Sequence, residues 1–373
     1  MMKKIGVLLI SVLLFICFLL GGVYVYVKSS IYEEEPTIVE EIKNDSKEEE
    51  DEVNYSKVEG ITNVLLIGMD KREDESSRSD SIIIATLDSK NSNIKLTSLY
   101  RDTLVDIPGY GKDRINAAFQ LGGVGLLEET IENTYGLQVN KYITIDFNGF
   151  EKIIDEIGGI ELDIQENQIE ELNKYIGEST GGNDCPITQP GKQLLNGKQA
   201  LSYSRIRYNV GDDYGRVERQ REVLTKIAEK IKETSPVKYL GIMDVILEYI
   251  KTNIDPIDAL NMAYTIFKFD DLEIKQISIP VLELTKDIEY GSLGSVLITD
   301  TEQNGKILND FIYKNEMPNS DNYNYGEILF LISQYENHRV YDKENSNVKT
   351  NKLQNQFYDE FEDYDNEEYY EFD

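Results

Sequence analysis

The sequence predicts an α/β domain with a layered, mixed β-sheet flanked by helices, preceded by one N-terminal transmembrane helix. Short apolar runs typical of buried strands alternate with longer segments of helical period between residues 60 and 313, and such alternation indicates helices layered on a sheet. Ahead of them, the 23 residues from Ile5 to Val27 carry no charge. As a helix this run spans roughly 35 Å, which is enough to cross a bilayer.

The charges that flank the apolar run predict its orientation. Lys3 and Lys4 precede it, whereas Lys28 and an acidic stretch follow it. Because basic flanks tend to remain inside the cell, we expect residues 1–28 to form a short cytoplasmic N-terminus and a single-pass anchor in the cell membrane. The rest of the chain is then extracytoplasmic. The alternative is a cleaved signal peptide, whose apolar region is normally shorter and ends at small residues.

Charge and polarity mark the segments on either side of the predicted domain. Residues 29–59 include the run EEEPTIVEEIKNDSKEEEDE, and so acidic a segment repels itself and is expected to form a disordered linker. Residues 314–373 are polar, and their last part, 359–373, contains nine carboxylates and no basic residue. We therefore expect a folded domain over residues 60–313, followed by a polar, acidic and mostly disordered tail.

The elements expected inside the domain follow from local periodicity. Apolar or alternating runs predict strands, and segments of helical period predict helices, one of which has Gly136 as its stop. The expected strands are residues 62–70, 81–88, 94–100, 141–147, 160–164 and 275–280. The expected helices are residues 122–136, 147–159, 214–233, 237–251 and 256–268, with a short docked helix at 326–335.

Composition excludes several kinds of chemistry. The chain has 38 basic and 69 acidic residues, a net charge of -31, which makes nucleic acid an unsuitable partner. His338, in the polar C-terminal region, is the only histidine of the sequence. Ser-His-Asp and Cys-His catalysis and most zinc sites are therefore excluded from the folded core. Any chemistry must depend on Asp, Glu, Arg, Lys, Tyr, Ser or a hard metal ion.

Arginine is concentrated in one stretch of this acidic chain, SYSRIRYNVGDDYGRVERQR at residues 202–221, which contains five arginines. The planar donors of arginine suit phosphate and carboxylate. Arg205 and Arg207 alternate, so an extended segment points both to one side. Arg216 and Gln220 lie four residues apart at the start of a predicted helix, and helix N-termini attract anions. The stretch predicts an anion site; the alternative is a solvated, salt-bridged helix start.

Two aspartates occupy the ends of neighbouring predicted strands. Asp70 ends one strand and Asp80 begins the next, so their carboxylates are placed to share a magnesium ion, which prefers one or two carboxylates together with phosphate oxygens and water. The alternative is a polar hairpin loop, where aspartate is common. Arg101 directly follows the strand that ends at Tyr100 and is expected to face the same strand-end cleft.

Three blocks of sequence, in a fixed order, carry a family resemblance. They read IGMD…RSDSIIIATLD, LYRDTLVDIPGYGKDRINAAFQLGG and PGKQLLNGKQALSYSRIR…DDYGRVERQR. With these blocks, residues 60–313 resemble the LytR-CpsA-Psr (LCP) family, and the N-terminal anchor also fits that family. The resemblance implies an LCP-type domain and a phosphotransferase of Gram-positive cell envelopes. Such an enzyme moves a glycopolymer (wall teichoic acid, capsule or a similar polymer) from an undecaprenyl diphosphate carrier to peptidoglycan, forming a phosphodiester.

The resemblance also implies roles for individual residues. Asp70 and Asp80 match metal ligands for Mg²⁺ or Mn²⁺, and Asp213 matches the family's acidic residue near the reacting phosphate, where Arg101 and Arg216 also act. The residues implied to grip the diphosphate are Arg101, Arg205, Arg207, Arg216 and Gln220. General chemistry agrees, because phosphoryl transfer needs positioning and charge neutralisation more than covalent help from the protein.

The role of Asp213 and the reaction both have alternatives. Asp213 can take the proton of an attacking hydroxyl, but it also precedes Tyr214, where the predicted helix begins, and aspartate is a favourable N-cap. A sensor or attenuator that binds a lipid diphosphate without turnover needs the arginines and no base. A phosphohydrolase sends the same intermediate to water.

Overall fold

The computed structural model describes part of the chain: residues 28–30, 58–69, 79–180, 185–207, 212–233, 242, 248–269 and 273–335. The predicted transmembrane run, most of the predicted linker, Asp70 and the chain beyond residue 335 lie outside these segments, and what the sequence predicts for them stays a prediction. Within the described segments, no helix combines the length and the apolar character needed to cross a membrane.

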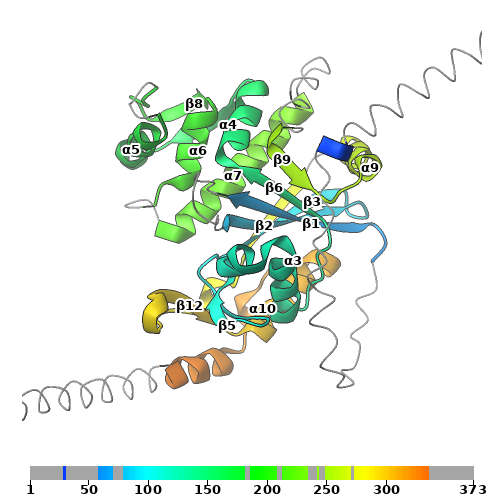
Figure 1. The fold of residues 1–373 in the computed structure, drawn as a ribbon, viewed down its shortest axis with the longest axis vertical. Helices are drawn as coiled ribbons and strands as arrows, with labels where there is room; N and C mark the ends of the chain where they lie inside the picture. Colours follow the sequence, from blue (N-terminus) through cyan, green and yellow to red (C-terminus); the bar gives the residue numbers. More distant parts are fainter. Residues whose placement is uncertain are drawn as a thin grey trace, which may run out of the picture.

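A six-stranded mixed sheet forms the centre of the domain (Figure 1). The spatial order is β10-β3-β2-β1-β6-β9, in which β10–β3 and β1–β6 are parallel pairs and the other neighbours are antiparallel. The predicted layered mixed sheet is therefore confirmed. The strands are β1 (Ile61–Met69), β2 (Ser79–Asp88), β3 (Asn93–Leu99), β6 (Tyr142–Asp146), β9 (Ile250–Thr252) and β10 (Glu273–Ile279).

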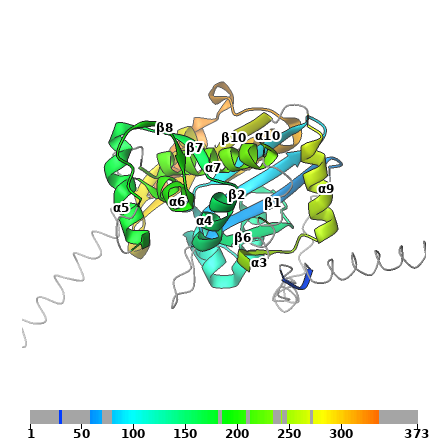
Figure 2. The ribbon, with the colours of Figure 1, turned by 90° about the horizontal axis from the view of Figure 1, so that it is seen from above.

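Helices cover both faces of the sheet, as Figures 1 and 2 show. α3 (Ile115–Tyr135) and α10 (Thr301–Lys314) lie on one face. The opposite face carries α4 (Phe147–Glu156), α5 (Ile169–Thr180), α6 (Gly197–Arg205) and α7 (Asp212–Glu233). α9 (Pro256–Phe267) follows β9 and lies beside the end of the sheet where β1 begins.

Within the described segments, three two-stranded ribbons and four short 3-10 helices connect these layers. The ribbons pair β4 (Leu104–Ile107) with β5 (Gly111–Arg114), β7 (Ile160–Ile164) with β8 (Gly191–Leu195), and β11 (Thr285–Glu289) with β12 (Ser295–Thr299). The 3-10 helices are η1 (Glu166–Gln168), η3 (Leu282–Leu284), η4 (Gly291–Leu293) and η5 (Ser320–Asn322).

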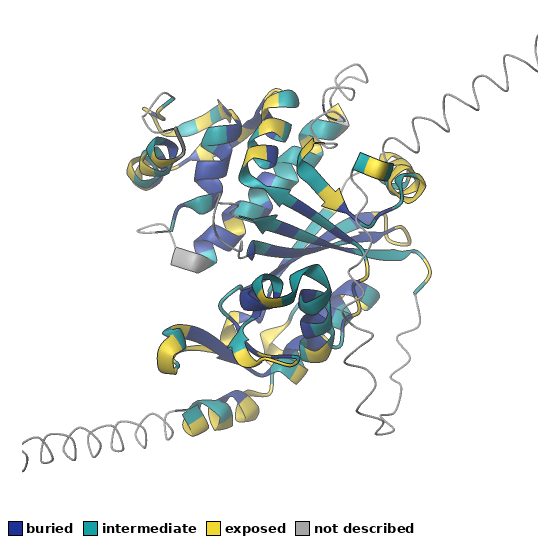
Figure 3. Cartoon of the chain, in the orientation of Figure 1, coloured by how far each residue is buried: buried dark blue, intermediate teal, exposed yellow. Residues whose placement is uncertain are grey.

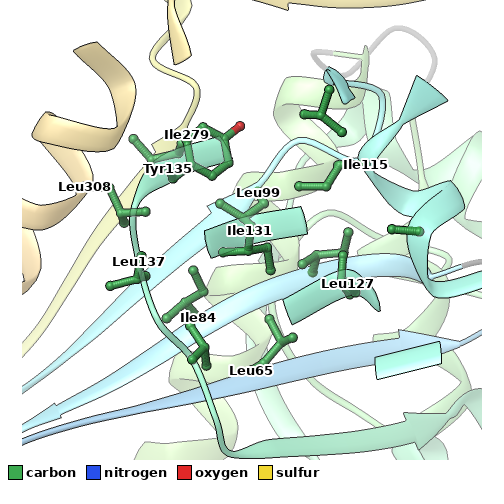
Figure 4. Packing of buried hydrophobic residues seen from close by; sticks show 14 of the residues in the cluster. Leu65, Ile84, Leu99, Ile115, Leu127, Ile131, Tyr135, Leu137, Ile279 and Leu308 are labelled. Atoms are coloured by element: carbon green, nitrogen blue, oxygen red, sulfur yellow. The ribbon is translucent and has the colours of Figure 1, made fainter. Parts of the chain in front are cut away.

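The larger core lies between the sheet and the pair α3 and α10 (Figure 4). Alternate residues of a strand share one face, so Leu65 and Ile84 point into this core together. They meet Leu127 and Ile131, which lie four residues apart on α3. A second cluster fills the space among α4, α5, α6, α7 and the β7–β8 ribbon. The apolar residues that β1 and β2 contribute to the larger core are Leu65, Ile67, Ile82 and Ile84.

The structure differs from the sequence-based expectations at several boundaries. α3 begins at Ile115 because the helix continues across a kink at Gly122 and Gly123. The expected helix over 237–251 is wrong at its end, where β-branched residues suited to a strand form β9 on β6. The packed chain also continues past residue 313: residues 325–335 are helical, and Ile328 is buried in the larger core.

A fully buried ion pair ties the sheet to α10. The Lys95 ammonium donates to Asp88 Oδ2 at 2.7 Å and to the Ile312 carbonyl at 2.6 Å, and both charged side chains are fully buried. Burial by itself raises the pKa of the Asp88 carboxyl, but hydrogen bonds from Lys95 and Asn91 outweigh burial and hold this pKa below its ordinary value. The pair is thus stable as charges only while both members are present.

Replacing Lys95 with methionine should lower the free energy of unfolding by about 3–5 kcal/mol at neutral pH, because it leaves the Asp88 charge buried without its cation. In the wild-type protein the pKa of Asp88 is lowered. The ion pair therefore contributes to the free energy of unfolding above the ordinary pKa of aspartate, and this contribution is lost only as the pH falls through the lowered pKa. In the variant, Asp88 should instead protonate readily. Urea unfolding of both proteins should therefore show a smaller difference near pH 4 than at pH 7; an unchanged difference would contradict this coupling.

A close backbone contact sets the packing of α6 on α4. The Gly197 N–H donates to Asp155 Oδ1 at 2.8 Å, and a Cβ added at Gly197 would lie only 2.1 Å from the Glu151 carbonyl oxygen. This approach is possible only without a side chain at residue 197.

We expect Gly197→Ala to lower the free energy of unfolding by about 1–3 kcal/mol, because the backbone must shift to accept a methyl group. Gly177→Ala is the matched control: Gly177 is inside α5, and its added Cβ would have nothing within 4 Å. The control should stabilise by about 0.4–1 kcal/mol through the unfolded state. Chemical denaturation of both variants checks the contrast, and equal effects would refute it.

Candidate functional site

One edge of the central sheet collects several strand ends. β1, β3, β6 and β10 end there and β2 begins there, as their pairing directions require. Met69 pairs with both Asp146 of β6 and Ser79 of β2. Because neighbouring strands are about 4.8 Å apart, the backbones at Asp146 and Ser79 lie roughly 10 Å from each other. We call this the strand-end edge.

Asp80 and Arg101 meet at the strand-end edge. Arg101 Nη1 donates to Asp80 Oδ1 at 2.6 Å, and Arg101 Nε donates to Asp102 Oδ2 at 3.3 Å. The other Asp102 oxygen lies 3.4 Å from Arg114 Nε. The Arg101 side chain is 17% exposed and that of Asp80 is 33% exposed. The two carboxylates thus hold the Arg101 guanidinium at a partly open surface, and a guanidinium with five N–H donors can still face an anion.

Arg205 lies beside two aromatic rings. Its guanidinium carbon lies 5.0 Å from the centre of the Phe147 ring and 4.9 Å from that of Tyr175, within the range of cation–π attraction. Phe147 directly follows Asp146 at the strand-end edge, and Tyr175 belongs to α5. Contact with two rings restricts the position of the guanidinium, whose N–H donors suit an anion.

The local sequence explains why Arg205 ends a helix. The Asn196 side chain accepts a hydrogen bond from the Gln199 backbone N–H, and the Gln199 side chain accepts one from the Asn196 backbone N–H. This reciprocal pair is a capping box. α6 then ends at Arg205, since Ile206 is extended. A basic residue in the last turn also complements the helix dipole.

Arg207 lies beside Arg205. Its backbone N–H donates to Glu171 Oε1 at 3.0 Å. Burial and the neighbouring Glu171 raise the pKa of the Tyr175 hydroxyl, while the charges of Arg207 and Arg205 both oppose this shift. Both arginines therefore act on the surroundings of the same tyrosine. The expected strand-like alternation, with Arg205 and Arg207 on one side of an extended segment, is wrong because Arg205 ends α6.

Two arginines of α7 are structural. Arg219, which is 5% exposed, donates from Nη2 to the carbonyl of Ile206, the residue between Arg205 and Arg207. Arg221, which is 8% exposed, donates to the Ile277 carbonyl at 2.6 Å and to the Ser278 hydroxyl. Burial lowers the pKa of both guanidinium groups. These bonds attach α7 to the end of α6 and to β10.

The remaining predicted residues belong to α7. The helix begins at Asp212 rather than Tyr214, which places Asp213 in its first turn; the Asp213 side chain is outside the described part of the structure. Arg216 is 5% exposed and Gln220 is partly buried. Tyr214 packs edge-on against Tyr100, with ring centres 5.2 Å apart. Because Tyr100 directly follows β3, the first turns of α7 lie beside the strand-end edge.

Only one of the two predicted metal ligands can be placed. Asp80 offers a partly exposed carboxylate, a donor that suits Mg²⁺, but it is paired with Arg101. Asp70 lies outside the described residues, although Met69, which precedes it, pairs with Ser79 next to Asp80. Among the described residues, no three His, Cys, Asp or Glu side chains gather as a metal site. The donor chemistry of Asp80 fits a hard cation shared with phosphate oxygens.

Phe147 and Tyr175, which lie beside Arg205, are not among the site residues that the sequence predicts. A signal for Phe147 is present, because it ends the alternating strand predicted over 141–147, at the same end as Asp80. Tyr175 has none, since its place beside Arg205 depends on how α5 packs on α6.

Several known proteins are similar to this chain in sequence. The sequence matches the LytR_cpsA_psr family over residues 24–311. It is 31% identical over 259 residues to the regulatory protein MsrR of Staphylococcus aureus, covering 69% of this chain and 76% of MsrR. It is 38% identical over 218 residues to the polyisoprenyl-teichoic acid–peptidoglycan teichoic acid transferase TagU of Enterococcus faecalis, covering 57% of this chain and 67% of TagU.

A solved structure shows the same fold. It is a LytR-CPS2A-psr family protein, YwtF (TagT), with bound octaprenyl pyrophosphate lipid, and it is 26% identical with a TM-score of 0.53. The similarity covers 68% of this chain and 91% of that one. The family match extends over more than half of the sequence and includes all three motif blocks. This chain therefore belongs to the LytR-CpsA-Psr family.

Proposed function

We propose that this protein is a phosphotransferase that moves a glycopolymer from an undecaprenyl diphosphate carrier to peptidoglycan. The observation that carries the proposal is the strand-end edge, where the partly exposed Arg101 guanidinium and the Arg205 guanidinium beside Phe147 lie in a chain of net charge -31. The name of TagU and the octaprenyl pyrophosphate bound to TagT support this ligand class. Wall teichoic acid is the polymer that TagU names, and we propose it first, ahead of capsule.

The arginines neutralise and orient the diphosphate in this proposal. Arg101 approaches from β3, and Arg205 and Arg207 approach from the end of α6. Arg216 and Gln220 belong to α7, whose first turns lie beside the same edge. Charge neutralisation from several sides favours the transition state of phosphoryl transfer, in which negative charge spreads over the phosphate oxygens.

The transfer step moves one proton and exchanges one bond. A hydroxyl oxygen of the peptidoglycan acceptor attacks the phosphorus that bears the glycopolymer, and its proton passes to the Asp213 carboxylate. The bond from this phosphorus to the bridging oxygen breaks, and polyprenyl phosphate leaves with that oxygen. The product is a phosphodiester between polymer and peptidoglycan.

We propose that Asp80, together with Asp70, holds Mg²⁺ or Mn²⁺ at the same edge. When bound, such an ion adds positive charge beside the diphosphate oxygens. Asp80 then has a second task, because it also orients Arg101 through their 2.6 Å contact. We further propose that the apolar run from Ile5 to Val27 anchors the protein in the cell membrane, with the domain outside.

Loss of Arg205 should weaken binding of a polyprenyl diphosphate. Arg205→Ala removes a charge-assisted contact and is expected to cost about 2–4 kcal/mol, or tens to several hundred fold in Kd. Arg205→Lys should rescue this only partly, since lysine has no planar fork. Phe147→Leu should weaken binding by about 0.5–2 kcal/mol through the lost cation–π contact.

Lys306→Ala is the control for the loss of a positive charge. Lys306 is an exposed lysine of α10 that pairs with Asp310. Binding of a polyprenyl diphosphate by calorimetry, with thermal melting of each variant, makes the comparison. If the Arg205 and Lys306 variants bind equally well, Arg205 does not contact the ligand.

Asp213→Asn separates transfer from binding. Asp213 lies inside the first turn of α7, one residue after the helix begins, and asparagine has the same size as aspartate, so folding and ligand binding should survive. A base that acts in the transition state lowers turnover without loosening the ground state, and we expect a loss of about 10²–10⁴-fold in transfer rate. Asp212→Asn, one residue earlier, is the matched control and should stay active.

The same assay tests the proposed function. Polymer on peptidoglycan indicates transfer, free polymer indicates hydrolysis, and binding without turnover indicates a sensor. The sensor is the second candidate because the relative MsrR is named a regulatory protein. Full transfer by Asp213→Asn would show that Asp213 is not the base.

A further inference from the structure

α9 exposes large apolar side chains that an ordinary surface helix buries. Four large apolar or aromatic side chains point outward: Ile257 is 56% exposed, Leu260 71%, Tyr264 60% and Phe267 74%. Their spacing of three, four and three residues places them on one stripe of the helix. No residue of α9 is buried. Figure 3 shows this helix largely in the colour of exposed residues.

The side of α9 that faces the domain is mixed. Asp258, Asn261, Met262 and Thr265 line a cavity shared with the start of β1 and with Lys141, and Met262 and Ile266 are partly buried. The Lys141 ammonium lies 2.9 Å from Asp258 Oδ2. Surface helices of soluble domains normally turn their apolar stripe to the core and their polar face outward. Here four large apolar or aromatic side chains point outward instead, which leaves an apolar face one helix wide with no cover from the described residues.

Residues 28–30 lie beside α9, and their position indicates that the membrane is close to this apolar face. Lys28 Nζ lies 3.5 Å from Asp255 Oδ2, the N-cap of α9, and Lys251 Nζ donates to the Ser30 carbonyl at 3.3 Å. Figure 1 shows this short segment beside α9. In the sequence, Lys28 directly follows the uncharged run that ends at Val27. The segment next to the proposed membrane anchor is therefore in contact with α9.

Charge and size favour a bilayer over a second protein. Lys28 lies near the beginning of the stripe, and Lys268, at its other end, holds its ammonium 4.3 Å from the Tyr264 ring centre. Lysines beside an aromatic and apolar face suit the headgroup region of a membrane. α9 has 12 residues, about 18 Å of helix, which is too short to cross a bilayer. A single such face is also smaller than the roughly 800 Å² per partner of a standard protein interface.

We propose that α9 docks on the membrane surface, with Ile257, Leu260, Tyr264 and Phe267 inserted at the level of the lipid headgroups. This inference rests on the proposed membrane anchoring and extends it. α9 lies at the start of β1, whereas the strand-end edge lies at its end. The nine residues of β1 span about 30 Å. Docking through α9 thus turns the strand-end edge away from the membrane, toward the wall.

The absence of tryptophan from the sequence permits a direct test. Leu260→Trp and Phe267→Trp are made singly in the full-length protein and reconstituted into vesicles. One set of vesicles contains lipids brominated near the glycerol backbone, a second contains lipids brominated near the chain end, and a third is unbrominated. Leu194→Trp is the matched control, since Leu194 is 63% exposed and lies on β8, away from α9.

Both α9 tryptophans should emit at shorter wavelength than the control and lose more than about half of their emission to the shallow bromines, since interfacial helices lie at that depth. The deep bromines should quench less. The Leu194→Trp protein should respond to iodide in the water and not to bromolipids.

Flotation of the same samples with the vesicles reports anchoring separately. Protein that floats while its α9 tryptophans respond only to iodide overturns the docking inference and leaves the anchor intact. α9 tryptophans shielded from both quenchers indicate a protein cover, a second copy or another segment of this chain, and also overturn it. Protein that does not float refutes the anchor and the docking inference together.

Discussion

The hydrogen bond from the buried Arg219 guanidinium to the Ile206 carbonyl is the constraint on which the proposed anion site depends. Ile206 lies between Arg205 and Arg207, so this bond fixes the backbone that carries both. Burial lowers the pKa of Arg219, while Tyr203 and nearby glutamates favour its charged form. Buried arginine is costly unless its donors are used. Here its donor attaches α7 to the end of α6.

A second consequence follows from the directions of the strands. Because β1 and β6 are parallel and β2 returns beside β1, Asp146, Met69 and Ser79 lie in register. The segments that bear Phe147 and Asp80 therefore meet at one edge, although they are far apart in the chain. Arg205 lies at this edge because it contacts the Phe147 ring, and Arg101 lies there because it pairs with Asp80. The mixed sheet thus gathers the charged groups of Asp80, Arg101 and Arg205 from three separate segments without any histidine.

The two ends of β1 have different surroundings. The end at Met69 has arginines and carboxylates. The beginning of β1 adjoins α9, whose large apolar side chains point outward. A catalytic domain that uses a lipid-linked substrate must contact both a membrane and a polar acceptor. An arrangement with an apolar helix at one end of the sheet and a basic edge at the other suits both tasks, and the sheet between them acts as a rigid spacer.

The sequence by itself determined the mixed α/β class, five of the six strands of the central sheet and the identity of the basic stretch. Long apolar runs are buried because exposure to water is unfavourable, and the motif blocks retain their order in the chain. The sequence also predicted a helix over 256–268. Tertiary structure decided that Arg205 ends a helix, that Phe147 and Tyr175 hold it, and that Arg219 and Arg221 are buried. It also decided which side of α9 faces outward. These features depend on contacts between segments distant in sequence, and local periodicity carries no information about which face of an element meets which neighbour.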